Sequence, residues 1–214
     1  GNLSHLQELL AFRNRLSGSL SSAFGHMTQL RVLNLQYQQQ HNCAPSSSLH
    51  GTLFPEIRFL TQLTYLDLSA NCMSGTIPSE ISNLSNLRAL YLNVNRFVGG
   101  LPTQLGLLDH SLQQLDLAYN RFSGTLPTEM GRMGGVYEIL LNHNDLHGTV
   151  PKTWADMQNI TKIALHGNAN LTGPMPVELC AHLWLQSILV DCAQFTTANM
   201  TCPCCLDVNY QPCS

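Results

Sequence analysis

The sequence predicts an α/β solenoid, in which short coils of chain stack on one another and share a parallel β-sheet. A pattern of the type Leu-x-x-Leu-x-Leu precedes a polar residue, and a glycine and usually a proline follow it, as in "MSGTIP" and "FSGTLP". The polar residue recurs in steps of 24, 33, 24, 25, 24 and 24 residues, at Asn14, Gln38, Asn71, Asn95, Asn120, Asn144 and Asn168. Periods of this length are typical of solenoids, whose units bury their apolar side against their neighbours.

Each part of the unit has a physical reason. The alternating Leu-x-Leu predicts a short strand with one face in the core and the other in solvent. Stacked units then form a parallel sheet with strands about 4.8 Å apart. The amide of the asparagine can satisfy buried backbone groups where the chain turns inward. Glycine permits a tight bend, and proline fixes φ there, so that every coil bends alike and the coils stack.

These units resemble the plant-type class of the leucine-rich repeat family, with the consensus Leu-x-x-Leu-x-Leu-x-x-Asn-x-Leu-Ser/Thr-Gly-x-Ile-Pro. The resemblance covers roughly residues 1 to 190. It implies a right-handed solenoid with the parallel sheet on the concave face, and with short second strands, 3₁₀ turns and loops on the convex side. Plant-type members include receptor ectodomains and inhibitors of wall-degrading enzymes.

Two parts of the chain are expected to differ in organisation. Residues 1–176 contain about seven repeats of 24 residues with an insertion near 39–48, and residues 177–214 contain a last partial repeat and a Cys-rich cap. Gln38 replaces an asparagine and Ala11 a leucine, and both should weaken local packing, Ala11 by about 1 to 3 kcal/mol. The start "GNLSHLQEL" matches "SNLSNLRAL" at 82–90, so we expect that Gly1 is not a natural terminus.

Composition favours an extracellular protein. Charged residues make up only 11% and the net charge is −3, which argues against nucleic-acid partners and anionic membranes. The sequence has no apolar run of membrane-spanning length. Acceptor motifs for N-linked glycans indicate a secreted or cell-surface location. They occur at Asn2, Asn83, Asn159, Asn170 and Asn199.

The eight cysteines indicate an oxidising compartment. Cys43 in the insertion and Cys72 in the next unit should form a disulfide that fixes the insertion. The other six lie in or beside the tail, at Cys180, Cys192, Cys202, Cys204, Cys205 and Cys213. Their spacing does not suit a zinc site, so we expect disulfides and no metal, with the pairing left open. Such a tail resembles those of secreted repeat proteins from stramenopile algae.

Enzyme signatures are missing from the sequence, and we expect neither catalysis nor a cofactor. One ladder of same-phase residues reads Asn34, Asp67, Tyr91, Asp116, Leu140 and Ala164. Its two carboxylates should lie roughly 10 Å apart, near the separation that inverting glycosidases use. An open sheet offers no pocket that would raise the pKa of either, so solvated carboxylates are the expectation.

The exposed strand positions instead favour recognition. Tyrosine and histidine present apolar bodies with polar tips, which is the usual chemistry of a binding surface. The expected ligand-binding residues on the concave face are Tyr37, Tyr65, Asp67, Tyr91, Asn93, Asp116, Tyr119, Tyr137, Asn142, His143 and His166. His143 and His166 lack a third ligand and do not predict a metal site. The insertion at 39–48 is a second candidate contact element.

These features favour two functions and argue against a third. The leading hypothesis is a non-catalytic extracellular module that binds a protein, peptide or polysaccharide through the concave face and the 39–48 loop. The alternative is a structural subunit of an extracellular matrix, cell wall or surface filament, in contact with neighbouring subunits. Ice or mineral binding would need a row of like residues such as threonine, and the ladders of the concave face are mixed.

Overall fold

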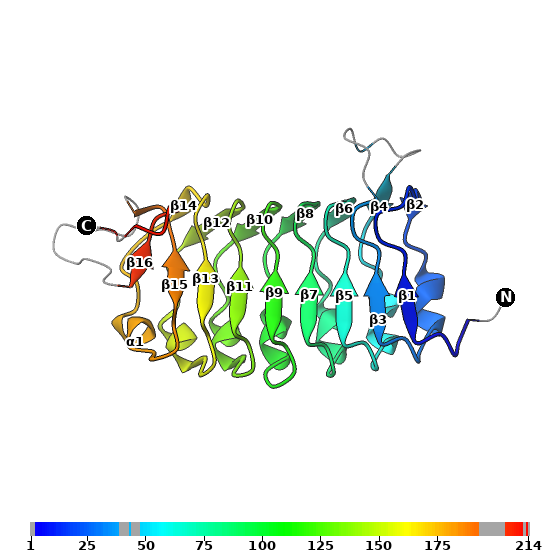
Figure 1. The fold of residues 1–214 in the computed structure, drawn as a ribbon, viewed down its shortest axis with the longest axis horizontal. Helices are drawn as coiled ribbons and strands as arrows, with labels where there is room; N and C mark the ends of the chain where they lie inside the picture. Colours follow the sequence, from blue (N-terminus) through cyan, green and yellow to red (C-terminus); the bar gives the residue numbers. More distant parts are fainter. Residues whose placement is uncertain (1–2, 39–42, 44–47, 193–203, 212, 214) are drawn as a thin grey trace.

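The computed structural model describes residues 3–38, 43, 48–192, 204–211 and 213. Within them the chain forms a solenoid in which every coil contributes one strand to a nine-stranded sheet and most coils contribute a second strand to a seven-stranded sheet. Pairing is parallel throughout both sheets. Figure 1 shows the nine-stranded sheet as a row of rungs between the two termini, with the strands of the smaller sheet along one edge of the coils. The α/β solenoid predicted by the sequence is confirmed.

The strands are short and follow the repeat. The nine-stranded sheet contains, in spatial order, β1 (Glu8–Leu10), β3 (Val32–Asn34), β5 (Tyr65–Asp67), β7 (Ala89–Tyr91), β9 (Gln114–Asp116), β11 (Glu138–Leu140), β13 (Lys162–Ala164), β15 (Ser187–Leu189) and β16 (Cys205–Leu206). The seven-stranded sheet contains β2 (Gly18–Ser19), β4 (Leu49–Gly51), β6 (Cys72–Gly75), β8 (Arg96–Gly99), β10 (Arg121–Gly124), β12 (Asp145–Gly148) and β14 (Asn170–Leu171).

A helical turn closes most coils. The 3₁₀ helices are η1 (Ser22–His26), η2 (Pro55–Phe59), η3 (Ser79–Asn83), η4 (Thr103–Leu107), η5 (Thr128–Arg132) and η6 (Lys152–Asp156), and the last turn is the short helix α1 (Val177–Cys180). The consensus proline stands at the N-cap of η3, η4, η5, η6 and α1. Its fixed φ and missing N–H suit a helix start, where no intrahelical acceptor exists.

The leucines of the repeat form one continuous core. In the third coil Leu63, Leu66 and Leu68 are all fully buried, and strand pairing aligns Leu66 with Leu90 of the next coil. Each coil therefore packs its leucines between those of its two neighbours, which is the stabilisation that a repeat lacks in isolation.

The recurring asparagine joins adjacent coils through its side-chain amide. Asn120 Nδ2 donates to the carbonyl of Leu117 in its own coil (3.1 Å) and of Leu92 in the preceding coil (3.0 Å). Its Oδ1 accepts from the backbone N–H of Phe97, also in the preceding coil (3.0 Å). Asn95, Asn144 and Asn168 repeat this arrangement. The amides thus satisfy buried backbone groups that no strand reaches.

Gln38 fills the same role in the second coil, so the expected local weakening is wrong there. Its side chain is completely buried. Oε1 accepts from the N–H of Leu16 (3.0 Å), and Nε2 donates to the carbonyls of Ala11 and Gln36. The longer side chain still presents one amide to both coils, which is the property that the position requires.

Backbone strain accompanies each of these amides. The residue immediately before the amide-bearing one has a positive φ in every repeat, with the values 53°, 58°, 51°, 56°, 54°, 56° and 71° at Arg13, Tyr37, Ala70, Val94, Tyr119, His143 and Gly167. Such a conformation is unfavourable for residues other than glycine. The hydrogen bonds of the following amide hold the chain there, so the side chains at this phase emerge at a constant angle.

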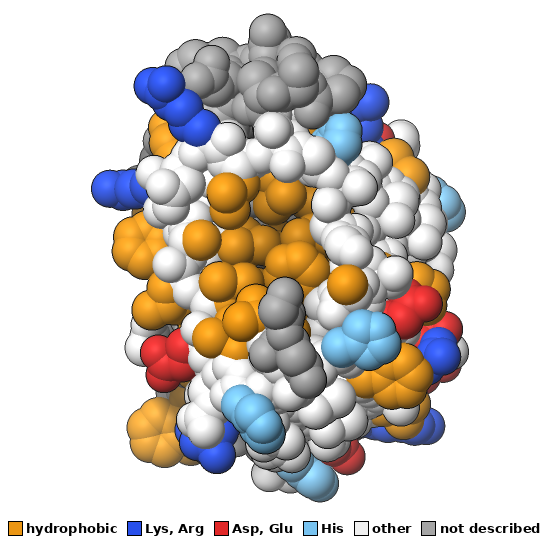
Figure 2. Space-filling view, turned by 90° about the vertical axis from the view of Figure 1, so that its right-hand side faces the viewer, with side chains coloured by type: hydrophobic (Ala, Val, Ile, Leu, Met, Phe, Trp, Pro, Cys, Tyr) orange, Lys and Arg blue, Asp and Glu red, His pale blue; other side chains and the backbone are white. Residues whose placement is uncertain are grey.

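The two ends of the stack are closed differently. Figure 2 looks at the N-terminal end, where apolar side chains gather in a patch surrounded by backbone and polar side chains. Leu6, Leu9 and Ala11 of the first coil are only partly buried there. At the other end β15 and β16 extend the sheet beyond the repeats.

Disulfides tie down both the insertion and the C-terminal cap. The structure pairs Cys43 with Cys72, Cys180 with Cys204, and Cys192 with Cys213. Cys205 is also disulfide-bonded, and Cys202 lies outside the described residues. The first pair is the one that the sequence predicted, and the other two resolve pairings that the sequence left open.

Replacing Asn120 by alanine tests the coil-joining role of the amide. Asn120→Ala should lower the free energy of unfolding by about 2 kcal/mol, because it leaves the buried Phe97 N–H without its acceptor and removes one of the two amide donors to the Leu92 carbonyl. The matched control is Asn14→Ala, because the exposed Asn14 amide forms hydrogen bonds only within its own coil. This substitution should lower the free energy of unfolding by less than about 1 kcal/mol. Equal effects in chemical denaturation would contradict the role.

Candidate functional site

The exposed side of the nine-stranded sheet, called the binding face below, is organised in ladders of same-phase residues. Strand pairing aligns Asn34 with Asp67, Asp67 with Tyr91, and Tyr91 with Asp116. It continues from Asp116 to Leu140 and then to Ala164. The ladder predicted from the repeat is therefore confirmed, and residues separated by about 24 positions in the sequence are neighbours in space.

Asp67 is not a solvated carboxylate, which corrects the expectation from the sequence. Its side chain is only 4% exposed. Oδ1 accepts from the N–H and the hydroxyl of Ser69 (2.9 and 2.6 Å), and Oδ2 accepts from the hydroxyl of Tyr65 (3.2 Å). Burial and the nearby charge of Asp67 raise the pKa of Tyr65. These hydrogen bonds occupy the Asp67 carboxylate, which fixes the Tyr65 side chain and the C-terminal end of β5.

Asp116 also departs from the expectation. Burial raises its pKa to about 6, and the carboxylates of Glu138 and Asp67 add to this, while a hydrogen bond from the Ala118 N–H (3.0 Å) opposes it. The physical cause is crowding on the sheet, because large side chains on the adjacent strands remove water from the carboxyl group. An open sheet therefore can desolvate a carboxylate without a pocket.

A chain of polar contacts crosses four strands beside these acids. The hydroxyl of Tyr91 donates to Gln114 Oε1 (2.6 Å), and Gln114 Nε2 donates to Glu138 Oε2 (3.2 Å). Glu138 Oε1 forms an ion pair with Lys162 Nζ (3.1 Å). Burial, followed by the neighbouring charges, raises the pKa of Tyr91 to about 12. Gln114, Glu138 and Lys162 were not predicted from the sequence. They form a ladder of their own, two positions earlier along each strand than the ladder through Asp116.

Aromatic rings line the same face in two groups. Tyr65 and Tyr91 have ring centroids 5.5 Å apart. Farther along, Tyr119 stacks on His143 at 4.3 Å, and His143 meets the edge of His166 at 5.2 Å. Burial and the proximity of His143 lower the pKa of His166. In the part of the chain that the structure describes, no group of three or more His, Cys, Asp or Glu side chains is arranged to hold a metal ion.

The remaining predicted residues are placed unevenly. Tyr37, Tyr119 and Tyr137 are 54%, 52% and 38% exposed and can reach a ligand, and Asn93 is partly exposed. Asn142 is buried, and this burial argues against a contact role for its side chain. Its backbone carbonyl accepts hydrogen bonds from the Tyr119 N–H and from Asn144 Nδ2. Residues 39–42 and 44–47 of the predicted contact loop lie outside the described residues, as do the acceptor motifs at Asn2 and Asn199.

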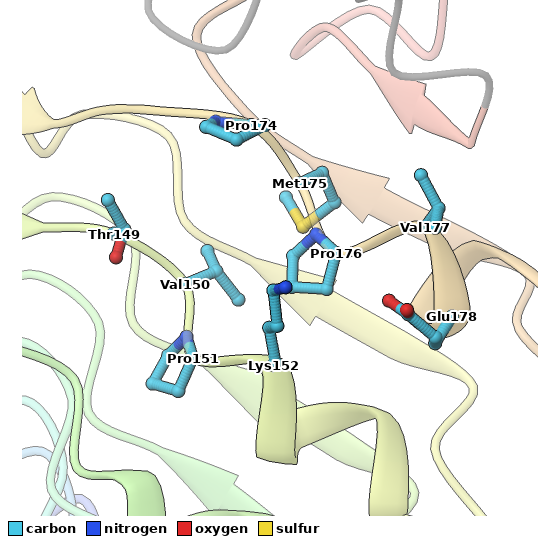
Figure 3. Close-up of a pocket in the computed structure, with 9 residues that line it drawn as sticks. All are labelled: Thr149, Val150, Pro151, Lys152, Pro174, Met175, Pro176, Val177 and Glu178. Carbon is cyan, nitrogen blue, oxygen red and sulfur yellow. The ribbon is translucent and has the colours of Figure 1, made fainter.

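A hollow on another surface was not predicted. It has a volume of about 370 Å³ and lies between the segments that follow β12 and β14. Figure 3 shows its lining side chains, which are Thr149, Val150, Pro151, Lys152, Pro174, Met175, Pro176, Val177 and Glu178. The two segments that form it are consensus Gly-x-x-Pro stretches from adjacent coils, so the lining is mostly apolar, with polar side chains at Thr149, Lys152 and Glu178.

The sequence analysis also missed a row of threonines along the seven-stranded sheet. Thr52, Thr76, Thr125 and Thr149 occupy the same phase of four coils and are all exposed. Gly100 stands at this phase in the intervening coil. The Gly-Thr dipeptide that recurs in these four coils is the sequence pattern that indicates the row, which lies away from the concave face.

Comparisons with known proteins agree with this architecture. The Leucine Rich Repeat family model matches residues 62–84 and 111–133. Among solved structures, the plant peptide hormone receptor RGFR1 in complex with RGF2 has a TM-score of 0.73 and 28% sequence identity over 87% of this chain. The Arabidopsis receptor kinase HAESA, in complex with the peptide hormone IDA and the co-receptor SERK1, has a TM-score of 0.69 and 25% identity over 86%.

A third similar structure has a different reported activity. A plant ice-binding protein has a TM-score of 0.66 and 27% identity, and the match covers 93% of this chain and 57% of that protein. The chain spans only about a third of the receptors, 32% of RGFR1 and 30% of HAESA. Curated protein sequences give no significant match. The fold is thus a leucine-rich-repeat solenoid like that of plant receptor ectodomains.

The structure and the comparisons are consistent with an extracellular location. The described cysteines form disulfides, and the similar receptor structures are ectodomains or complexes with peptide hormones. None of the helices in the described part of the chain has the length and apolar character needed to cross a bilayer.

The raised pKa of Asp116 predicts that this residue opposes folding at neutral pH. The native state binds its proton more tightly than the unfolded state, so the penalty is absent below the ordinary pKa near 3.8 and develops as pH rises through about 6. Asp116→Asn should therefore raise the free energy of unfolding by on the order of 1–2 kcal/mol at pH 7.5 and have little effect at pH 3.5.

Chemical denaturation at both pH values measures the difference. Asp145→Asn, at an exposed position of β12, is the matched control and should show no such pH dependence. A native-state carboxyl titration of Asp116 near pH 4 would contradict the prediction.

Proposed function

We propose that this chain is an extracellular, non-catalytic recognition module that binds a peptide or protein segment across the binding face. The observation that carries the proposal is a pair of contact networks on one face of the sheet. One runs from the Tyr65 and Tyr91 rings through hydrogen bonds to Lys162, and the other consists of the rings of Tyr119, His143 and His166. Rigid aromatic residues with polar tips lose little conformational entropy on binding, which is why they dominate protein interfaces.

The charges of the binding face favour a particular ligand chemistry. The carboxyl groups of Asp116, Glu138 and Asp191 lie on or beside β9 to β15, and Lys162 is paired with Glu138. An extended segment carrying amide donors or basic side chains would complement this acidic, hydrogen-bond-accepting surface. The solenoid presents such groups on successive strands about 4.8 Å apart, so an extended peptide that crosses the strands would pass several of them in turn.

The solved relatives support this class of partner. RGFR1 and HAESA are each in complex with a peptide hormone or peptide ligand, and receptor ectodomains of this fold are typically non-catalytic. A polysaccharide ligand and a role as a structural subunit of an extracellular assembly are the alternatives that the experiment below distinguishes.

Selection of peptides from a displayed random library against the purified chain tests the proposal. Selected peptides should bind Tyr91→Ala and Tyr119→Ala at least about tenfold more weakly, because truncating a central aromatic contact typically costs more than 1 kcal/mol. Arg121→Ala is the control, since this exposed residue lies on β10 of the other sheet, and it should not change the affinity.

Isothermal titration of each variant gives the comparison. Peptides that bind all three variants equally would contradict use of the binding face. A chain that selects no peptide and assembles into regular fibres or lattices would instead support the structural subunit.

A second candidate function is ice binding, favoured by the threonine row and the similarity to a plant ice-binding protein. Successive coils place the exposed threonines at a regular spacing near that of parallel strands, about 4.8 Å. The Thr76 methyl packs towards the next coil, where a Cβ on Gly99 would approach it to 2.9 Å. A fixed row of hydroxyl and methyl groups can order water in a lattice, whereas mobile charged side chains cannot.

Filling the gap in the row provides a gain-of-function test. A Cβ at Gly100 would meet only the Ser123 carbonyl, at 3.8 Å, so Gly100→Thr should fold and should strengthen inhibition of ice recrystallisation. The double variant Thr76→Lys with Thr125→Lys should abolish it without loss of thermal stability. Wild-type protein that leaves ice crystal growth unchanged would rule this candidate out.

A further inference from the structure

A hollow of about 420 Å³ lies beside the start of strands β11 and β13, outside the binding face proper. Its lining consists of Gln113, Gly135, Tyr137, Asn159, Thr161 and Trp184. The volume falls in the range of small-molecule sites. The lining is unusual for the surface of this protein, because it combines two aromatic rings with two side-chain amides.

The repeat explains how these residues meet. Gly135, Asn159 and Trp184 each precede the first apolar residue of their coil, so they occupy one phase of three successive coils. The backbone N–H of Tyr137 donates to Gln113 O (2.9 Å) and that of Thr161 to Tyr137 O (2.9 Å), which ties the adjoining ladder together. Asn159 therefore stands between a coil without a side chain at this phase and a coil that carries an indole.

Gly135 lines the hollow beside Asn159 with its backbone alone. A Cβ at Gly135 would come within 3.0 Å of His110 O and 3.2 Å of Leu112 O, so the packing of the coils excludes other residues there. Asn159 is exposed, and its Nδ2 donates to the carbonyl of Gly134 (2.7 Å). This bond fixes the direction of the side-chain amide along the edge of the hollow.

The opposite wall is an exposed aromatic surface. Trp184 is 70% exposed and Tyr137 is 38% exposed. An indole ring left in water on an ordered coil is costly, since a large apolar area remains hydrated. A pyranose ring has an apolar C–H face and a rim of hydroxyl groups, and therefore matches an indole face flanked by amide and hydroxyl groups.

Asn159 itself is an acceptor for such a ring. Asn159, Ile160 and Thr161 form an Asn-X-Thr motif, and a protein of the secretory pathway can carry a glycan on this nitrogen. The Thr161 hydroxyl donates to Tyr137 O (2.8 Å), so the motif and the aromatic wall belong to one connected structure. Attachment at Nδ2 still leaves one N–H on the amide nitrogen.

We propose that an N-linked glycan on Asn159 occupies this hollow, with its first sugar residue packed against Trp184 and Tyr137. The glycan would then be an ordered part of the surface that shields the Trp184 indole from water. The inference rests on the extracellular location in the proposed function, but not on peptide binding.

Tryptophan quenching tests the proposal, because the two tryptophans differ sharply in exposure. Trp154 is completely buried and donates from Nε1 to Pro127 O (3.0 Å), so acrylamide quenching reports mainly on Trp184. In protein secreted from a eukaryotic host, quenching should be weak in the wild type and should rise towards that of free tryptophan in Asn159→Gln. Asn83→Gln, which removes an acceptor on η3, is the control and should not change it.

Site-resolved glycopeptide mass spectrometry completes the test. Occupied Asn159 together with glycan-dependent shielding of Trp184 would support the proposal. It would be overturned by Asn159 remaining bare while Asn83 or Asn170 is occupied, or by equal quenching in Asn159→Gln and wild type. A secreted chain with no glycan at any site would overturn it as well and would remove one support for the extracellular location, while leaving peptide binding to be judged separately.

Discussion

The structure depends on a side-chain amide that adjacent coils of the repeat share, buried at Gln38, Asn71, Asn144 and Asn168 and partly buried at Asn95 and Asn120. Leucine packing supplies the apolar contact, but it is non-directional and would tolerate coils that slide or rotate against each other. The amides of Asn95, Asn120, Asn144 and Asn168 remove that freedom, because each accepts from one coil and donates to two. Gln38 shows that the requirement is for a correctly placed amide rather than for asparagine itself.

The same constraint creates the surfaces. Because each coil is held in one rotation relative to the next, residues of one phase become straight ladders, and a function can be spread over coils that are distant in the sequence. The binding face draws its aromatic and polar side chains from several such ladders. The seven-stranded sheet carries the threonines, and the hollow beside Asn159 lies where a glycine in one coil meets a tryptophan two coils later. One scaffold thus presents several chemically distinct surfaces without a conventional cleft.

Desolvation on the binding face arises from this regularity. Adjacent strands are so close that Tyr65, Tyr91 and Glu138 crowd the carboxyl groups between them, and the pKa of Asp116 rises although the sheet is open. Side chains of the neighbouring ladders therefore remove water from the Asp116 carboxyl group, as burial in a pocket would. The two acids therefore have different roles. Asp67 is buried and accepts hydrogen bonds from Ser69, whereas Glu138 forms an ion pair with Lys162.

The sequence by itself determined the period, the solenoid and the ladder through Asp67, Tyr91 and Asp116, because each follows from local spacing repeated along the chain. It also predicted the pairing of Cys43 with Cys72, because the insertion lies beside the unit that carries Cys72. It could not determine which same-phase side chains are buried. Asp67 and Asn142 were expected at the surface, and their burial depends on the sizes of side chains in neighbouring coils. The chain of contacts from Tyr91 to Lys162 and the hollow around Asn159 were likewise decided by the tertiary structure, since each arises where different ladders meet and no single repeat contains it.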